Sequence, residues 1–200
     1  MNNDNPQMVL DFWFEGVTQT EIPQHRIDLW FGKSDATDTL LKERFENLVE
    51  RAADGSLKSW DESPQGRLAL VVLLDQFPRN IYRGTPRAFS HDPLARLLVL
   101  TGLDHRMDED LNSAEKLFFY LPLEHTEDKL IQYRSVQCFD HLRKVAPPQL
   151  AKMTELFYDY AVKHQVVIDR FGRFPHRNVI LGRESTPEEI EFLKQPGSSF

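Results

Sequence analysis

The sequence predicts an all-α protein of about eight helices, packed as stacked antiparallel helical hairpins. Apolar residues recur at steps of three and four residues along nearly the whole chain, as expected for helices with one buried face. Prolines and capping residues separate these segments, and no stretch alternates apolar and polar residues over a useful length. The β-branched residues from Val166 to Ile168 lie within a helical pattern.

The first two expected helices are amphipathic. Gln7–Glu15 carries an aromatic face and is followed by Gly16, a residue typical of helix ends. The second helix begins at Ser34 or Asp35, either of which can act as its N-cap. Its apolar residues follow the helical spacing, and the Asp54-Gly55 pair is expected to end the helix.

Prolines mark the expected ends of the third and fourth helices. The third starts at Pro64 and is apolar on nearly every side, so we expect it at the centre of the core. Pro78 is expected to end it, because the residue before a proline avoids helical geometry. Ser90 is the expected N-cap of the fourth helix, with Pro93 in its first turn.

The second half of the chain contains three clear helix starts. Asn112 with Glu115 is a variant of the capping box, and Thr126 is the expected N-cap of a long helix that ends in basic residues. Two adjacent prolines precede the longest expected helix, over residues 149–171. Pro187–Leu193 then forms a last short helix.

Length and composition favour a single domain over residues 1–200. The net charge of −7 argues against binding to nucleic acid or to an anionic membrane surface. The lone cysteine, Cys138, fits a reducing compartment, and the start of the sequence lacks a secretory pattern. We therefore expect a cytoplasmic protein, and no motif in it predicts a cofactor.

Two short segments concentrate the basic charge. Residues 76–89 and 170–183 together hold seven arginines and no acidic residue. Arginine binds carboxylate or phosphate through two parallel hydrogen bonds and stacks on aromatic rings, and Phe77 and Phe174 stand among these arginines. The expected ligand-binding residues are Gln76, Arg79, Asn80, Arg83, Arg173, Arg177 and Asn178. A purely structural role, capping helices or pairing with acids, is the alternative.

Residues 121–129 contain a histidine among carboxylates. Here Glu124 could orient His125 as a general acid or base, and His176 is a second candidate for that role. The same side chains could bind a metal ion, but their spacing matches no zinc signature, so none is predicted. An ordinary helix start explains the acids equally well.

Three stretches, LLDQFPRNIYRGTPRAFSHD, FFYLPLEHTED and DRFGRFPHRN, resemble the hallmark motifs of the bacterial domain-of-unknown-function 924 family. The resemblance covers essentially the whole chain and implies a tetratricopeptide-like α-α superhelix, although the tetratricopeptide consensus itself is not legible. It implies no activity. Since the motifs coincide with the charged segments, one shared site is expected, formed by Asp75, Gln76, Arg79, Asn80, Glu124, His125, Arg173, His176, Arg177 and Asn178.

The sequence thus favours a pocket for a small anionic ligand bearing phosphate or carboxylate, with acid/base chemistry as a further possibility. The alternative is a non-catalytic helical scaffold that binds an acidic peptide segment. A third reading gives both arginine segments structural roles only. The oligomeric state and the ligand do not follow from the sequence.

Overall fold

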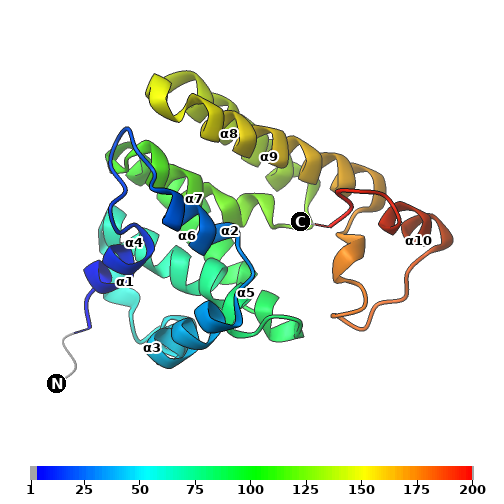
Figure 1. Ribbon diagram of the computed structural model, residues 1–200, viewed down its shortest axis with the longest axis horizontal. Helices are drawn as coiled ribbons and strands as arrows, with labels where there is room; N and C mark the ends of the chain where they lie inside the picture. The colour runs from blue at the N-terminus through cyan, green and yellow to red at the C-terminus, as the bar shows by residue number, and fades with distance from the viewer. Residues whose placement is uncertain (1–3, 200) are drawn as a thin grey trace.

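The protein is all-α, as the sequence predicts. The computed structural model describes residues 4–199, which form helices and turns but no β-strand (Figure 1). The helices are α1 (Pro6–Trp13), α2 (Gln24–Phe31), α3 (Asp35–Ala53), α4 (Pro64–Val71), α5 (Phe77–Ile81), α6 (Asp92–Asp104), α7 (Ser113–Glu124), α8 (Lys129–Val145), α9 (Ala151–Phe171) and α10 (Pro187–Leu193). The finer expectation of a tetratricopeptide-like superhelix stays a prediction.

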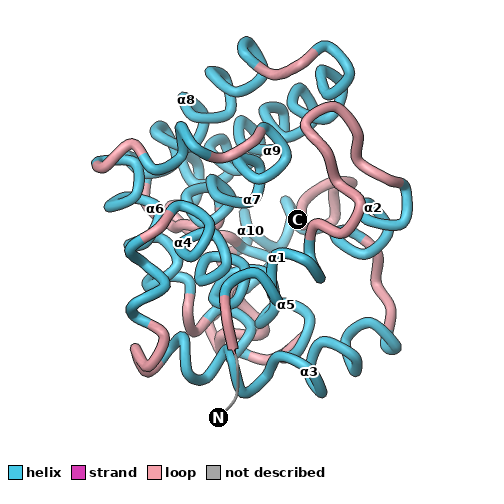
Figure 2. The backbone as a smooth tube through the Cα atoms, turned by 90° about the vertical axis from the view of Figure 1, so that its left-hand side faces the viewer, coloured by secondary structure: helices cyan, strands magenta, loops and turns pink. Residues whose placement is uncertain are grey.

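Helices α4 and α7 form the centre of the fold. Every residue from 66 to 78 and from 117 to 124 is buried, which confirms the central place predicted for the third helix. Helix α4 packs against α1, α6 and α7, and α7 also packs against α8 and α9. The views in Figures 1 and 2 show α8 and α9 side by side on one flank, and Figure 1 shows α10 beyond the end of α9.

Aromatic side chains fill the interior between the N-terminal helices and α7. Trp13 packs edge-on against Phe77 and Phe118, with ring centroids 5.4 and 5.6 Å apart. Such pairs contribute about 0.5–1.5 kcal/mol beyond their burial. Phe77, which the sequence places among the arginines of the first basic segment, is therefore a core residue, fully buried in the main apolar cluster.

Several predicted helix starts are confirmed. Ser34 caps α3 by accepting a hydrogen bond from Thr37, and Thr186 caps α10. At the start of α7, both hydrogen bonds of the Asn112–Glu115 capping box are present. These features depend on residues three positions apart, so the sequence is sufficient to find them.

Two other predicted caps are wrong. His91, not Ser90, stands at the N-cap of α6, and the Ser90 hydroxyl donates to the Arg87 carbonyl. Asp128, not Thr126, caps α8. Helix α7 continues through Pro122, and the Thr126 hydroxyl donates to that proline's carbonyl at 2.8 Å, satisfying a group at the helix end.

Pro78 does not end the third helix, contrary to the prediction. A π-helical turn, Val72–Gln76, follows α4 directly and leads into α5. In this wider turn the amide of Phe77 donates to the carbonyl of Val72, five residues earlier. Pro78 lies directly after this wider turn, as the second residue of α5, and the helical run continues through it.

The sequence reading also missed α2. This helix has eight residues, no side-chain N-cap bond, and only Arg26 and Trp30 buried. Because two buried positions make no recognisable stripe, the periodicity does not reveal it. Among the described residues, no helix is long and apolar enough to cross a lipid bilayer.

Candidate functional site

A polar cluster lies where six parts of the chain meet. The π-helical turn supplies Asp75, α5 supplies Arg79, and the start of α6 supplies Asp92. The end of α7, helix α9 and the loop after it complete the set. We use the term polar cluster for Asp75, Arg79, Asp92, Glu124, His125, His164, His176 and Arg177.

The centre of the cluster is a hydrogen bond between Asp75 and His125. His125 Nδ1 lies 2.8 Å from Asp75 Oδ1, and the Asp75 side chain is completely buried while 14% of the His125 side chain is exposed. An ionised carboxylate can only accept, so Nδ1 donates to it and Nε2 of a neutral imidazole keeps its lone pair. Gln76 donates to the second oxygen of Asp75.

The charges around this pair keep Asp75 ionised and His125 neutral. Burial alone raises the pKa of Asp75, but the charge of Arg79 and the contact with His125 outweigh it and lower the pKa to about 2. Burial, assisted by the positive charge of Arg79, lowers the pKa of His125. The positive charge that Asp75 needs is thus supplied by Arg79, whose Nη1 lies 3.2 Å from Asp75 Oδ1.

Two arginines from the two basic segments converge on Asp92. Arg79 donates to both Asp92 oxygens, at 2.9 and 3.1 Å, and Arg177 Nη1 donates to one of them at 3.3 Å. Phe89 and Phe174 lie over the Arg177 guanidinium, each with its ring centroid 4.6 Å from Cζ. Burial and the neighbouring charge of Arg79 lower the pKa of Arg177 to about 10.

The sequence suggested that Glu124 orients His125, but in the structure it does not. Glu124 Oε1 lies 3.0 Å from His164 Nδ1, which also lies 2.8 Å from the carbonyl of Tyr160. A carbonyl only accepts, so His164 Nδ1 carries the proton. Burial, together with the charge of Asp75, raises the pKa of Glu124 well above its usual value.

His176 and Phe174 reach the cluster on the loop that follows α9. Phe174 is completely buried, with its ring centroid 5.4 Å from that of His164 and 5.6 Å from that of His176. Burial and the charge of Arg177 lower the pKa of His176 to about 4. Glu127 anchors this loop, since it accepts hydrogen bonds from the Phe174 amide and from Arg183.

The other predicted ligand-binding residues are engaged elsewhere. Asn80 and Arg83 both donate to Asp38 in the first turn of α3, at distances of 2.7 to 3.0 Å. Arg173 and Asn178 both donate to Glu189 of α10. These four side chains fasten loops to neighbouring helices, whereas Gln76, Arg79 and Arg177 are in or beside the polar cluster.

The sequence reading missed two members of the cluster. Asp92 follows the first basic segment and has no local feature that singles it out. His164 could have been found, because it shares the buried face of α9 with Phe157, Ala161 and Ile168. A histidine in an apolar stripe of a helix is a signal for a buried polar contact.

From the lowered pKa values of the buried histidines, we expect the protein to be less stable in acid. His125, His164 and His176 all have a pKa below the unfolded value of 6.5. Each therefore favours folding above pH 6.5, and this contribution is lost as the pH falls through the folded pKa, about 4 for His176. The raised pKa of Glu124 changes the free energy of unfolding in the opposite direction. We expect the three histidines together to outweigh this single carboxyl group.

We therefore expect the free energy of unfolding, measured in urea, to fall steadily between pH 6.5 and pH 4.5. His176→Gln should make this slope shallower, while His25→Gln, at an exposed position, should not change it. A free energy of unfolding that is constant over this range would contradict the assignment of neutral buried histidines.

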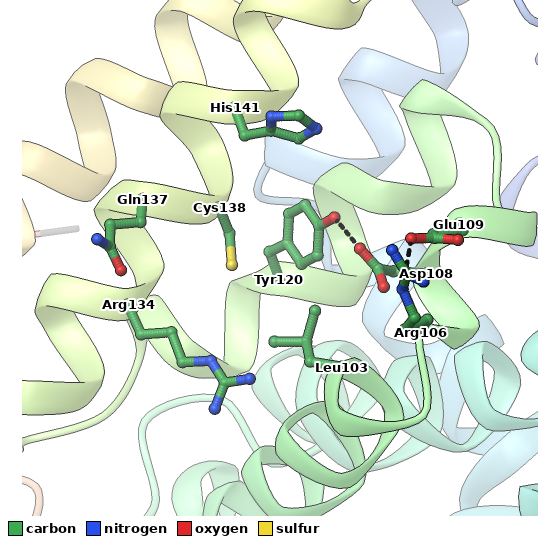
Figure 3. Close-up of a pocket in the computed structure, with 9 residues that line it drawn as sticks. All are labelled: Leu103, Arg106, Asp108, Glu109, Tyr120, Arg134, Gln137, Cys138 and His141. Atoms are coloured by element: carbon green, nitrogen blue, oxygen red, sulfur yellow. Dashed lines mark hydrogen bonds and ion pairs between the residues drawn. The ribbon is translucent and has the colours of Figure 1, made fainter.

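Two surface cavities lie away from the polar cluster. One, of about 320 Å³, is lined by residues of α6, α7, α8 and the turn before α7, including Tyr120, Cys138 and His141 (Figure 3). In it the Tyr120 hydroxyl donates to Asp108 at 2.6 Å. Burial raises the pKa of the Cys138 thiol to about 11, which makes it a poor nucleophile. The other, of about 490 Å³, lies over residues 151–159.

No metal centre is formed by the side chains of residues 4–199, since no three His, Cys, Asp or Glu among them are placed to hold an ion together.

The motifs that build this site are shared with known proteins. Residues 9–197 match the family described as bacterial protein of unknown function, DUF924. The chain belongs to the DUF924 family. The DUF924 match spans all six parts of the chain that supply the polar cluster, which confirms the resemblance seen in the sequence.

One solved structure shares the DUF924 fold. The chain is similar to a protein of unknown function, ATU0120, from Agrobacterium tumefaciens, with 36% sequence identity and a TM-score of 0.79. The similarity covers 94% of this chain and 96% of that one. No curated protein sequence matched the chain.

Proposed function

We propose that the polar cluster binds a small anionic ligand and carries out acid/base chemistry on it. The observation that supports this most strongly is the Asp75–His125 pair, in which a fully buried carboxylate fixes the tautomer of a partly exposed histidine. A general base is oriented in this way, with its tautomer fixed at one ring nitrogen and the other nitrogen left to accept a proton. Asp75 also sits in a π-helical turn, a feature frequent at functional sites.

In this proposal His125 is the base. Its Nε2 forms no hydrogen bond with any residue in the described part of the chain and can take a proton from water or from the ligand. The imidazolium that results is stabilised by the Asp75 carboxylate, as in other histidine–aspartate pairs. Hydrolysis or isomerisation of a carboxylated or phosphorylated metabolite is the class of reaction that such a base serves.

Arg177 would hold the anionic group of the ligand, with Arg79 beside it. Arg177 is only 6% exposed, yet one hydrogen bond to Asp92 is the only one its guanidinium makes with residues 4–199. Its Nε is buried and makes no hydrogen bond within that range. Buried polar groups are normally satisfied, so these open donors indicate a place for an acceptor from outside the chain.

Non-catalytic binding of an acidic peptide segment, the alternative function, would use the arginines but leave the Asp75–His125 pair without a role. The single cysteine is free and half-buried, and we propose the reducing, cytoplasmic location that this fits.

Turnover of a panel of small carboxylate and phosphate esters, lactones and hydroxy acids tests the proposal. We expect His125→Gln to lower kcat/KM by about 10²–10⁴ while ligand binding changes little, because a general base contributes about that factor. His25→Gln, at an exposed position, is the matched control. Ligand binding without any turnover, unaffected by His125→Gln, would instead support the peptide-binding scaffold.

A further inference from the structure

We infer that the ligand group held by Arg177 is a planar carboxylate carrying one negative charge, and not a phosphate. This inference rests on the proposed function and specifies its substrate class. It follows from the hydrogen-bond donors of Arg177 that have no partner among the described residues and from the charges already present beside them. Either kind of anion would have satisfied the sequence pattern alone.

One edge of the Arg177 guanidinium has no hydrogen-bond partner among the described residues. The rings of Phe89 and Phe174 lie over the guanidinium, both at 4.6 Å from Cζ. Nη1 is engaged with Asp92 at 3.3 Å. Within residues 4–199, Nε and Nη2 make no hydrogen bond, so the open edge is the one that carries these two nitrogens.

That edge presents two parallel N–H groups in one plane. The two coplanar oxygens of a carboxylate match such a fork through two parallel hydrogen bonds. A phosphate group is tetrahedral, so its other oxygens lie out of that plane, whereas both oxygens of a carboxylate lie in it. The apolar rings of Phe89 and Phe174, with centroids 4.6 Å from Cζ, offer such additional oxygens no hydrogen bond, so the surroundings of Arg177 favour a flat anion.

The charge balance of the cluster points the same way. Asp75 and Asp92 already face Arg79 and Arg177, so two formal negative charges oppose two positive ones. A ligand brings its charge into this balanced, largely buried setting. The cost of desolvating an ion rises with the square of its charge, and a phosphate monoester is mostly a dianion at pH 7. Desolvating the single charge of a monocarboxylate therefore costs less than desolvating a phosphate dianion.

Matched probes separate the two anions. Benzoate and phenylphosphonate share a phenyl ring, and acetate and methylphosphonate form a smaller pair of the same kind. Their dissociation constants would be measured by calorimetry on the full chain, together with the ¹H–¹⁵N signal of Arg177 Nε in arginine-labelled protein. Arg177→Lys keeps the charge but removes the fork, and Arg83→Lys, on the Asp38 pair, is the matched control.

We expect at least one carboxylate to bind and shift the Arg177 Nε signal, and to bind at least about tenfold more weakly to Arg177→Lys but not to Arg83→Lys. Its phosphonate partner should bind at least about tenfold more weakly to the wild type. Should Arg177→Lys fail to fold, the Nε shift in the wild type decides.

Tighter binding of a phosphonate, or equal binding of both probes in a pair, would overturn the carboxylate assignment and leave an anion site in place. Failure of all four probes would remove the anion site and with it the ligand part of the proposed function. A carboxylate that binds as expected, while His125→Gln leaves turnover unchanged, would refute only the acid/base role.

Discussion

The Asp75→Asn variant is expected to lose turnover by a factor of about 10²–10⁴ in the assay described for His125. Asparagine has nearly the same shape as aspartate but no negative charge. Without that charge, the imidazolium that forms when His125 takes a proton loses its hydrogen-bonded counter-charge, and the positive charge of Arg79 remains close by. The pKa of His125 should therefore fall below its value in the wild type.

Both consequences can be measured. Turnover gives the first, and the pH dependence of the His125 signals in NMR spectra gives the second without any knowledge of the substrate. Asp104→Asn, in an exposed pair with Arg134, is the control and should change neither. An unchanged or raised pKa of His125, or turnover within threefold of the wild type, would refute the role given to Asp75.

The second large effect is expected on stability. Asp92→Ala removes the carboxylate shared by Arg79 and Arg177, whose side chains are 20% and 8% exposed. Removing one partner of a buried ion pair costs about 3–5 kcal/mol, because a charge stays buried without compensation. Urea unfolding should show this loss, while the exposed pair tested by Asp104→Ala should account for about 0–1 kcal/mol.

A double variant identifies the cause. If the uncompensated cations are responsible, Arg177→Met should recover part of the loss when it is added to Asp92→Ala, so that the two effects are not additive. Strict additivity, or a loss below about 1 kcal/mol for Asp92→Ala alone, would show that Asp92 is not the hub of the cluster.

Local features of the fold could be predicted because their causes are local. The cap at Ser34 and the box at Asn112–Glu115 each join atoms within one turn. Where the same kind of residue has a competing partner, the prediction failed. Thr126 meets the criteria for an N-cap. Because α7 continues to Glu124, however, the Thr126 hydroxyl donates to the carbonyl of Pro122 instead.

The sequence by itself determined the all-α class, the central third helix and the segments that carry the candidate site. The sequence could not predict which acidic residue each arginine pairs with. Arg79 and Arg177 meet at Asp92, and Arg177 lies 85 residues from it along the chain. Arg83 and Arg173, in the same two segments, fasten loops to α3 and α10 instead.

The same holds for the histidine. Glu124 is adjacent to His125 in sequence, yet Asp75, 50 residues away, accepts the hydrogen bond from His125 Nδ1, and Glu124 contacts His164 instead. The last residues of a helix point in different directions around its axis, so neighbours in the chain face different elements. Periodicity and caps are set over a few residues, whereas the partner of a buried charge is set by the packing of whole helices, and only the tertiary structure decides it.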